Sequence, residues 1–91
     1  MKYVVCYDVP EAKIRAKVTK CLQAVAYRVQ YSVFSGDGSI SEIRMLQKKL
    51  ERIVVSSGKA RLLVLLLTEE CVEKSWSYGV SLEEKKSYVL A

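Results

Sequence analysis

The sequence predicts an α+β fold in which two helices pack on one face of a β-sheet. Two runs, residues 2–7 and 62–67, are almost continuously apolar, as buried strands are. A third run, residues 27–33, alternates apolar with polar side chains, which indicates a strand with one open face. Because a doubly wound parallel sheet is covered on both faces, the open face favours a two-layer sandwich.

Length and charge limit the domain organisation and the partners. The chain has 91 residues, which predicts a single domain over residues 1–91. A chain of this size buries only roughly 60% of its unfolded surface, so an oligomer is expected to add stability. The 15 Lys and Arg against 10 Asp and Glu give a net charge of +5, without any histidine. That balance favours nucleic acid or an anionic membrane surface as a partner, although ordinary solubilising charge explains it equally well.

Cysteines and hydropathy predict a cytoplasmic protein. The three cysteines, Cys6, Cys21 and Cys71, share no metal-type spacing, so we expect reduced thiols. No signal peptide follows Met1, because the chain runs directly into a short strand pattern. The longest apolar run, residues 62–67, is far shorter than the ~20 residues needed to span a bilayer, so no membrane segment is expected.

The first strand ends at Asp8, and a helix is expected to follow directly. Pro10 suits the first position of a helix, which places the N-cap at Val9. Apolar residues then recur at helical spacing and are expected to face the sheet: Ile14, Val18, Cys21, Leu22 and Val25. Lysines gather on another face of this helix: Lys13, Lys17 and Lys20.

The alternating strand over residues 27–33 has one polar face. That face holds Arg28, Gln30 and Ser32. The alternation breaks at Phe34, so we expect a bulge, or a break into two short strands, near residues 32–34. Residues 36–38, Gly-Asp-Gly, predict a turn. Four tyrosines are expected in the core or within strands: Tyr3, Tyr7, Tyr27 and Tyr31.

A second helix is predicted from the capping-box spacing of Ser39 and Glu42. Its core-facing stripe is expected to be Ile43, Leu46, Leu50, Ile53 and Val54. Residues 56–58, Ser-Ser-Gly, end this helix, and the apolar strand over residues 62–67 follows.

The C-terminal third is expected to contain a short third helix and a tail. Thr68 is placed to cap that helix, and Trp76 is interpreted as a packing anchor on it. A link rich in lysine and glutamate then leads to a short apolar end, residues 87–91.

Catalytic residue types are few, and Asp8 is the main candidate. Without histidine there is no Ser–His or Cys–His pair, and no glycine-rich phosphate loop follows a strand. Asp8 stands at the C-terminal end of a predicted buried strand, and its oxygens suit Mg²⁺ or Mn²⁺. One carboxylate per chain makes a weak site, but a two-fold dimer brings two copies together. The alternative is that Asp8 only organises the turn into the first helix.

Several other side chains are candidates for nucleic-acid contact. Arg15 and Arg28 offer bidentate geometry to phosphate oxygens, whereas the Lys13–Lys17–Lys20 stripe fits a solvated helix face better. Phe34 is a candidate for stacking on a base, with a core or interface position as the alternative.

Two segments resemble the Cas-two family of CRISPR-associated proteins. Residues 2–9, Lys-Tyr-Val-Val-Cys-Tyr-Asp-Val, look like the family's first strand with its characteristic aspartate. Residues 28–36, Arg-Val-Gln-Tyr-Ser-Val-Phe-Ser-Gly, resemble its strand signature, in which Gln-x-Ser-Val-Phe is the most specific part. The order of the remaining elements also fits, so the resemblance covers nearly the whole chain.

The resemblance implies a ferredoxin-like two-layer sandwich and a homodimer. It implies that residues 80–91 form a link and an exchanged strand, in which residues 86–91 extend the partner's sheet. Asp8 matches the family's metal-binding aspartate, with Mg²⁺ or Mn²⁺ as the ion. Four residues match positions implicated in nuclease activity or substrate contact: Arg15, Arg28, Ser32 and Phe34. Lys17 stands where relatives often carry arginine, and it keeps the charge without the guanidinium fork.

The resemblance also implies a role in CRISPR adaptation, the acquisition of spacers, with DNA or RNA bound. In one interpretation the protein is a metal-dependent endonuclease that acts through Asp8. In the other it is a non-catalytic scaffold that bridges copies of the Cas-one integrase on a DNA duplex. A toxin-type endoribonuclease of the same fold is a third and weaker alternative.

Overall fold

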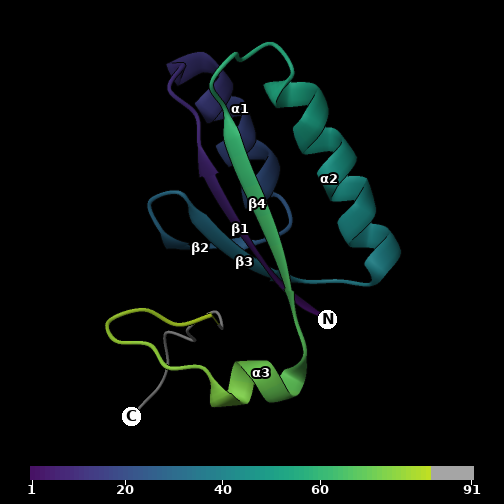
Figure 1. Ribbon diagram of the computed structural model, residues 1–91, viewed down its shortest axis with the longest axis vertical. Coiled ribbons are helices and arrows are strands. Elements are labelled where there is room, and N and C mark those ends of the chain that lie inside the picture. Colours follow the sequence, from purple (N-terminus) through teal and green to yellow (C-terminus); the bar gives the residue numbers. More distant parts are fainter. Residues whose placement is uncertain (83–91) are drawn as a thin grey trace.

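The computed structural model, which describes residues 1–82, consists of one four-stranded sheet and three helices (Figure 1). The elements in chain order are β1 (Lys2–Asp8), α1 (Ala12–Gln23), β2 (Tyr27–Gln30), β3 (Val33–Asp37), α2 (Ile40–Val54), β4 (Arg61–Leu67) and α3 (Glu69–Lys74). The strand order is β2-β3-β1-β4, and every neighbouring pair is antiparallel. This arrangement is the ferredoxin-like α+β sandwich, so the predicted fold class is confirmed.

The two faces of the central strand β1 have different environments. Tyr3, Val5 and Tyr7 are buried and face the helices. They form one hydrophobic core with Val18 and Leu22 of α1, Phe34 of β3, and Ile43, Leu46 and Leu50 of α2. Successive side chains of a strand point to opposite faces. The even-numbered residues of β1, which end with Asp8, therefore lie on the face that the two long helices leave open.

Gly36 in β3 allows the ring of Tyr3 to lie directly against the backbone. A Cβ atom at this position would lie 2.4 Å from the Tyr3 hydroxyl oxygen, well inside van der Waals contact. Tyr3 and Gly36 are cross-strand neighbours on the helix-covered face. Glycine is therefore required here by close approach, which accounts for the glycine that closes the 28–36 segment.

The start of α2 agrees with its prediction, whereas the start of α1 does not. The Ser39 Oγ accepts a hydrogen bond from the Glu42 backbone N–H, and the Ser39 N–H donates to the Glu42 carboxylate. In α1 the N-cap is Glu11, so the prediction of Val9 as N-cap with Pro10 in the first turn is wrong. The Glu11 backbone is still extended, and its carboxylate accepts a hydrogen bond from the Ser57 Oγ at 2.7 Å. The chain therefore turns into α1 two residues later than the proline suggested.

The alternating run over residues 27–33 is a hairpin rather than one strand. β2 and β3 are joined by Tyr31 and Ser32, so the predicted break into two short strands is confirmed. The irregular register lies earlier than expected, between Arg28 and Gln30. Gly36 and Asp37 belong to β3, so the turn predicted at residues 36–38 is wrong.

Some apolar residues predicted to be buried are exposed in the described chain. Tyr31, at the hairpin tip, is 92% exposed. β4 is an edge strand, and its alternate residues Leu63 and Leu65 lie on the open face. Val25 follows the end of α1 and faces water, and Trp76 is exposed beyond α3, so neither packs into the core as expected.

The last described residues return to the open face of the sheet. Ser35 is fully buried, and its Oγ donates a hydrogen bond to the Leu82 carbonyl at 2.8 Å. The segment predicted as the exchanged strand, residues 86–91, lies outside the described residues. Within residues 1–82 the structure contains no helix with the length and hydropathy needed to cross a membrane.

Candidate functional site

Asp8 lies at the C-terminal end of β1 with its side chain exposed. Its backbone is held in the sheet between β3 and β4, since β1 pairs with both strands. Within residues 1–82 its carboxylate forms no ion pair. The strand therefore presents an unpaired carboxylate at a fixed position on the open face.

Arg15 holds the loop that follows Asp8. One guanidinium nitrogen, Nη1, donates to the Val9 carbonyl at 2.9 Å and to the Pro10 carbonyl at 3.3 Å. A second link, from the Ser57 Oγ to the Glu11 carboxylate, ties the same loop to the connection between α2 and β4. Arg15 therefore lies beside the loop that follows Asp8, and the hydrogen bonds that it donates there are to backbone carbonyls.

Ser32 lies on the other side of the same strand end. Its carbonyl accepts a hydrogen bond from the Tyr7 N–H at 3.0 Å, which fixes the β2–β3 hairpin against the last residues of β1. The Ser32 side chain is half-buried. Asp8, Arg15 and Ser32, which are separated in the sequence, thus lie at the same end of the sheet.

Phe34 occupies the core and is inaccessible to a base. Its side chain has no exposed surface, and its ring stacks with that of Tyr7 at a centroid distance of 6.3 Å. The Arg28 guanidinium lies over the Phe34 ring, 5.2 Å from its centroid, in a cation–π contact. Of the two alternatives for Phe34, the structure selects core packing.

Lys17 is exposed on α1, together with Lys13 and Lys20. The structure gives no contact between these lysines and Asp8. Arg61, which the sequence interpretation did not single out, is the nearer cation, because it is paired with Asp8 across β1 and β4. The sequence alone did not indicate Arg61, because its position opposite Asp8 depends on strand register, which is set by long-range pairing.

The described residues of one chain supply the type of ligand that a divalent ion prefers, but too few of them for a complete site. Carboxylate oxygens are the ligands that Mg²⁺ and Mn²⁺ prefer, and Asp8 supplies one exposed carboxylate. Residues 1–82 contain no group of three or more His, Cys, Asp or Glu that could hold a metal. A complete site therefore needs further ligands from a second copy, a nucleic acid or water.

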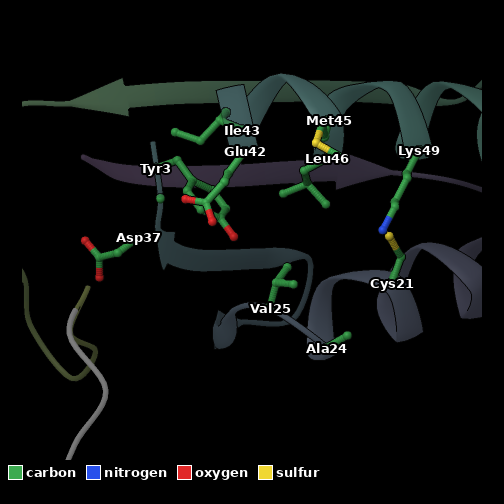
Figure 2. Close-up of a pocket in the computed structure, with 11 residues that line it drawn as sticks. Tyr3, Cys21, Ala24, Val25, Asp37, Glu42, Ile43, Met45, Leu46 and Lys49 are labelled. Carbon is green, nitrogen blue, oxygen red and sulfur yellow. The ribbon is translucent and has the colours of Figure 1, made fainter. Parts of the chain in front are cut away.

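A pocket of ≈ 580 Å³ lies between α1 and α2, away from Asp8 (Figure 2). Tyr3 and Glu42 lie close together in it, and Cys21 and Lys49 extend into it from the two helices. Burial raises the pKa of the Tyr3 hydroxyl, and the nearby Asp37 raises it further. Hydrogen bonds from Ser39 lower the pKa of Glu42. The pKa shifts of Tyr3 and Glu42 are thus caused by burial and by neighbouring residues of the fold itself.

Comparison with known proteins places the chain in a family. The sequence model described as "CRISPR associated protein Cas2" matches residues 1–75. A relative from Aeropyrum pernix, named CRISPR-associated endoribonuclease Cas2, is 33% identical over 99% of both chains. One with the same name from Thermus thermophilus is 34% identical over 84% of this chain and 80% of its own. A shorter match, to Cas2 3 of Synechocystis, is 43% identical over 59% of each chain.

Solved structures agree with these matches. A structure described as "Crystal structure of cas2" superposes with a TM-score of 0.74 and 26% identity, over 100% of this chain and 95% of that one. A chain of a "Partial Cas6-RT-Cas1--Cas2 complex" has the same fold, with a TM-score of 0.69 and 24% identity over 93% and 98%. The family match over residues 1–75 and the agreement in fold support one assignment. The chain belongs to the Cas2 family of CRISPR-associated proteins, the Cas-two family that its sequence motifs resemble.

Proposed function

We propose that this protein acts in CRISPR adaptation as a homodimer that binds nucleic acid and hydrolyses phosphodiester bonds with a divalent ion at Asp8. The observation that carries this proposal is the exposed carboxylate of Asp8 at the end of a central strand, which has no ion-pair partner among residues 1–82. A carboxylate that is neither buried nor paired contributes little to folding stability. Its fixed position among backbone-anchored loops therefore suits a role in binding or chemistry.

The net charge of +5 supports nucleic acid as the ligand. Cations repel one another in the folded protein, and a polyanion relieves that repulsion. Arg61 and Lys59 are exposed at or beside the same strand end, and Arg15 stands on the adjacent helix. A nucleic-acid backbone close to Asp8 would therefore meet positive charge on more than one element.

The open face of the sheet supports a dimer. Leu63 is 54% exposed and Leu65 is 43% exposed on this face. Covering a half-exposed leucine contributes about 1 kcal/mol, so a second copy would stabilise the small monomer. Asp8 lies on the same face, and a two-fold axis there would bring a second Asp8 toward the first.

Two Asp8 carboxylates, one from each copy, would hold Mg²⁺ or Mn²⁺ together with water and phosphate oxygens. When bound, the ion would supply positive charge to the scissile phosphate and lower the pKa of water. Arg15 would keep the loop after Asp8 in place through its bonds to Val9 and Pro10. The fixed loop would keep the backbone that carries Asp8 at one position.

The names of relatives support two classes of function. Those from Aeropyrum pernix and Thermus thermophilus are named endoribonucleases, which favours cleavage of RNA. The complex that contains Cas1 favours a scaffold in which this protein bridges the Cas-one integrase on DNA. Nucleic-acid binding is common to both, and participation in spacer acquisition is the role that we favour. A toxin-type endoribonuclease would have no integrase partner.

Binding and cleavage should be measured on single- and double-stranded RNA and DNA, with Mg²⁺, Mn²⁺ or chelator. We expect sequence-independent binding whose logarithmic affinity falls with the logarithm of salt by roughly 0.9 per neutralised phosphate of a duplex. Cleavage that requires the metal would support the enzyme. Duplex binding without cleavage would support the scaffold, and no binding at all would contradict both.

The dimer has its own test in sedimentation equilibrium. The double variant Leu63→Ser, Leu65→Ser should shift the protein toward monomer, because it makes the proposed interface polar. Met45→Ser on α2 is the matched control, since Met45 is 63% exposed on the outer layer. Equal dissociation in the two variants, or none in either, would contradict an interface on the open face.

A further inference from the structure

Arg61 is the partner of Asp8 across the β1–β4 pair. Residues directly opposite one another in a sheet place their side chains on the same face. Both are exposed, and they line one shallow pocket of ≈ 250 Å³ with Cys6, Tyr7, Leu62 and Leu63. Neither charged group forms an ion pair within residues 1–82, although their signs are opposite. The fold therefore presents a free carboxylate and a free guanidinium side by side.

Tyr31 stands on the opposite side of the same strand end. With Ser32 it forms the two-residue connection between β2 and β3. The bond from the Tyr7 N–H to the Ser32 carbonyl anchors that connection one residue before Asp8. Tyr31 is nevertheless 92% exposed, so its ring has almost no packing role in one chain. An anchored backbone with a free ring is the arrangement that a stacking contact needs.

We propose that Arg61 binds a phosphate and Tyr31 stacks on an unpaired base, so that the Asp8 site takes single-stranded nucleic acid or a splayed end. This inference rests on the proposed function and adds its substrate class. A guanidinium offers paired donors to phosphate oxygens, whereas the Asp8 carboxylate repels them, so the phosphate belongs on the Arg61 side. Bases inside a duplex have both faces covered, so away from the duplex ends a ring at the site can stack only on a base that is unpaired.

A second exposed aromatic group clarifies the choice of Tyr31. Trp76 and Tyr78 stack on each other at 6.5 Å and are more than 80% exposed. They follow α3, whose glutamates repel phosphate: Glu69, Glu70 and Glu73. The base-stacking role is therefore assigned to Tyr31, the aromatic ring at the Asp8 end of the sheet, rather than to this pair.

The test measures the affinity of labelled 20-nucleotide single strands and the matching duplexes, at several salt concentrations, without divalent metal. Tyr31→Ala should weaken single-strand binding by about 5- to 150-fold and leave duplex binding within twofold. Tyr31→Phe should retain the affinity, because it keeps the ring. Tyr78→Ala is the matched control, an exposed tyrosine at the other end of the sheet, and should have no effect.

Arg61→Ala should reduce the slope of log affinity against log salt by roughly 0.7 for single strands, the loss of one phosphate contact. Arg61→Lys should keep the slope and bind more weakly, since it loses the fork. The inference would be overturned if the Tyr31 and Arg61 variants bound single strands as tightly as the wild type. It would also be overturned if Tyr31→Ala weakened duplex binding equally, or if Tyr78→Ala had the same effect as Tyr31→Ala. In each of these cases the proposal of nucleic-acid binding would stand. A wild-type protein that binds neither strand form would overturn the proposed function and this inference together.

Discussion

The charged groups at the two ends of the sheet differ in whether they form ion pairs. At the end where α3 begins, the Lys2 Nζ lies 3.0 Å from the Asp37 Oδ2, and the amino group of Met1 donates to the Gly38 carbonyl. At the end where β1 finishes, Asp8 and Arg61 are adjacent and exposed without an ion pair in the described chain. Figure 1 shows β1 and β4 running between these ends.

We infer from this contrast that charged groups at one end of the sheet stabilise the fold, whereas those at the other end are available for binding and chemistry. Paired charges and capped helices stabilise the α3 end, where Ser39 and Thr68 both accept hydrogen bonds from backbone N–H groups. The Asp8 end also contains hydrogen bonds, from Arg15 to the Val9 carbonyl and from Ser57 to the Glu11 carboxylate, but within residues 1–82 none of them engages the side chain of Asp8 or Arg61. The groups left free there are the ones that we propose to meet a ligand. Substitutions at the two ends should therefore have different consequences.

Phe34→Ala should have the largest effect on stability. The ring is fully buried, so its removal should lower the free energy of unfolding by about 3–5 kcal/mol, measured by urea denaturation. Phe34→Leu should lower it much less, because it leaves a smaller cavity. Nucleic-acid affinity of the folded fraction should not change in Phe34→Leu. A stable Phe34→Ala protein with weakened nucleic-acid binding would indicate that Phe34 contacts the ligand. It would contradict the assignment of different roles to the two ends of the sheet.

Gly36→Ala should have the next largest effect, because its Cβ would lie 2.4 Å from the Tyr3 hydroxyl oxygen. We expect a loss of about 1–3 kcal/mol in the free energy of unfolding, with nucleic-acid affinity unchanged. Gly58→Ala is the matched control, since nothing lies within 4 Å of a Cβ at that position. Equal stability of the two variants would show that the close packing of Tyr3 on β3 has no energetic importance.

Ser39→Ala should lower the free energy of unfolding by about 1 kcal/mol near neutral pH, since it removes the N-cap of α2. The pKa of Glu42 is lowered from 4.5 by its bonds with Ser39, so its stabilising contribution is present above pH 4.5. That contribution is lost as the pH falls through the lowered pKa. The stability difference between wild type and Glu42→Gln should therefore shrink below pH 4.5. A difference that grows on acidification would contradict the capping role.

Much of the fold follows from local patterns, because capping and helical periodicity depend on neighbouring residues. The Ser39–Glu42 box and the stripe containing Ile43, Leu46 and Leu50 are present as predicted. The break in the alternation before Phe34 also marked the hairpin. The prediction from Pro10 was wrong because the loop before α1 is held by Arg15 and Ser57, which lie later in the chain.

The site was only partly predictable, because it depends on which residues face each other across the sheet. Asp8 stood out as a polar residue that ends an apolar strand. Arg61 did not, since its place opposite Asp8 requires the β1–β4 register. Phe34 and Tyr31 have similar rings in one segment, but Phe34 faces the helices from β3, whereas Tyr31 lies in the two-residue β2–β3 connection and is exposed.

The most direct measurement compares Asp8→Asn with Asp37→Asn, the aspartates that end β1 and β3 at opposite ends of the sheet. Metal-dependent cleavage and the free energy of unfolding should be measured for both. Asp8→Asn should reduce cleavage on the order of 100-fold or more and leave stability within about 0.5 kcal/mol. Asp37→Asn should cleave as wild type does and be the less stable of the two, because it loses the Lys2 pair. Cleavage that survives in Asp8→Asn, or is lost equally in both, would contradict the assignment of chemistry to the Asp8 end.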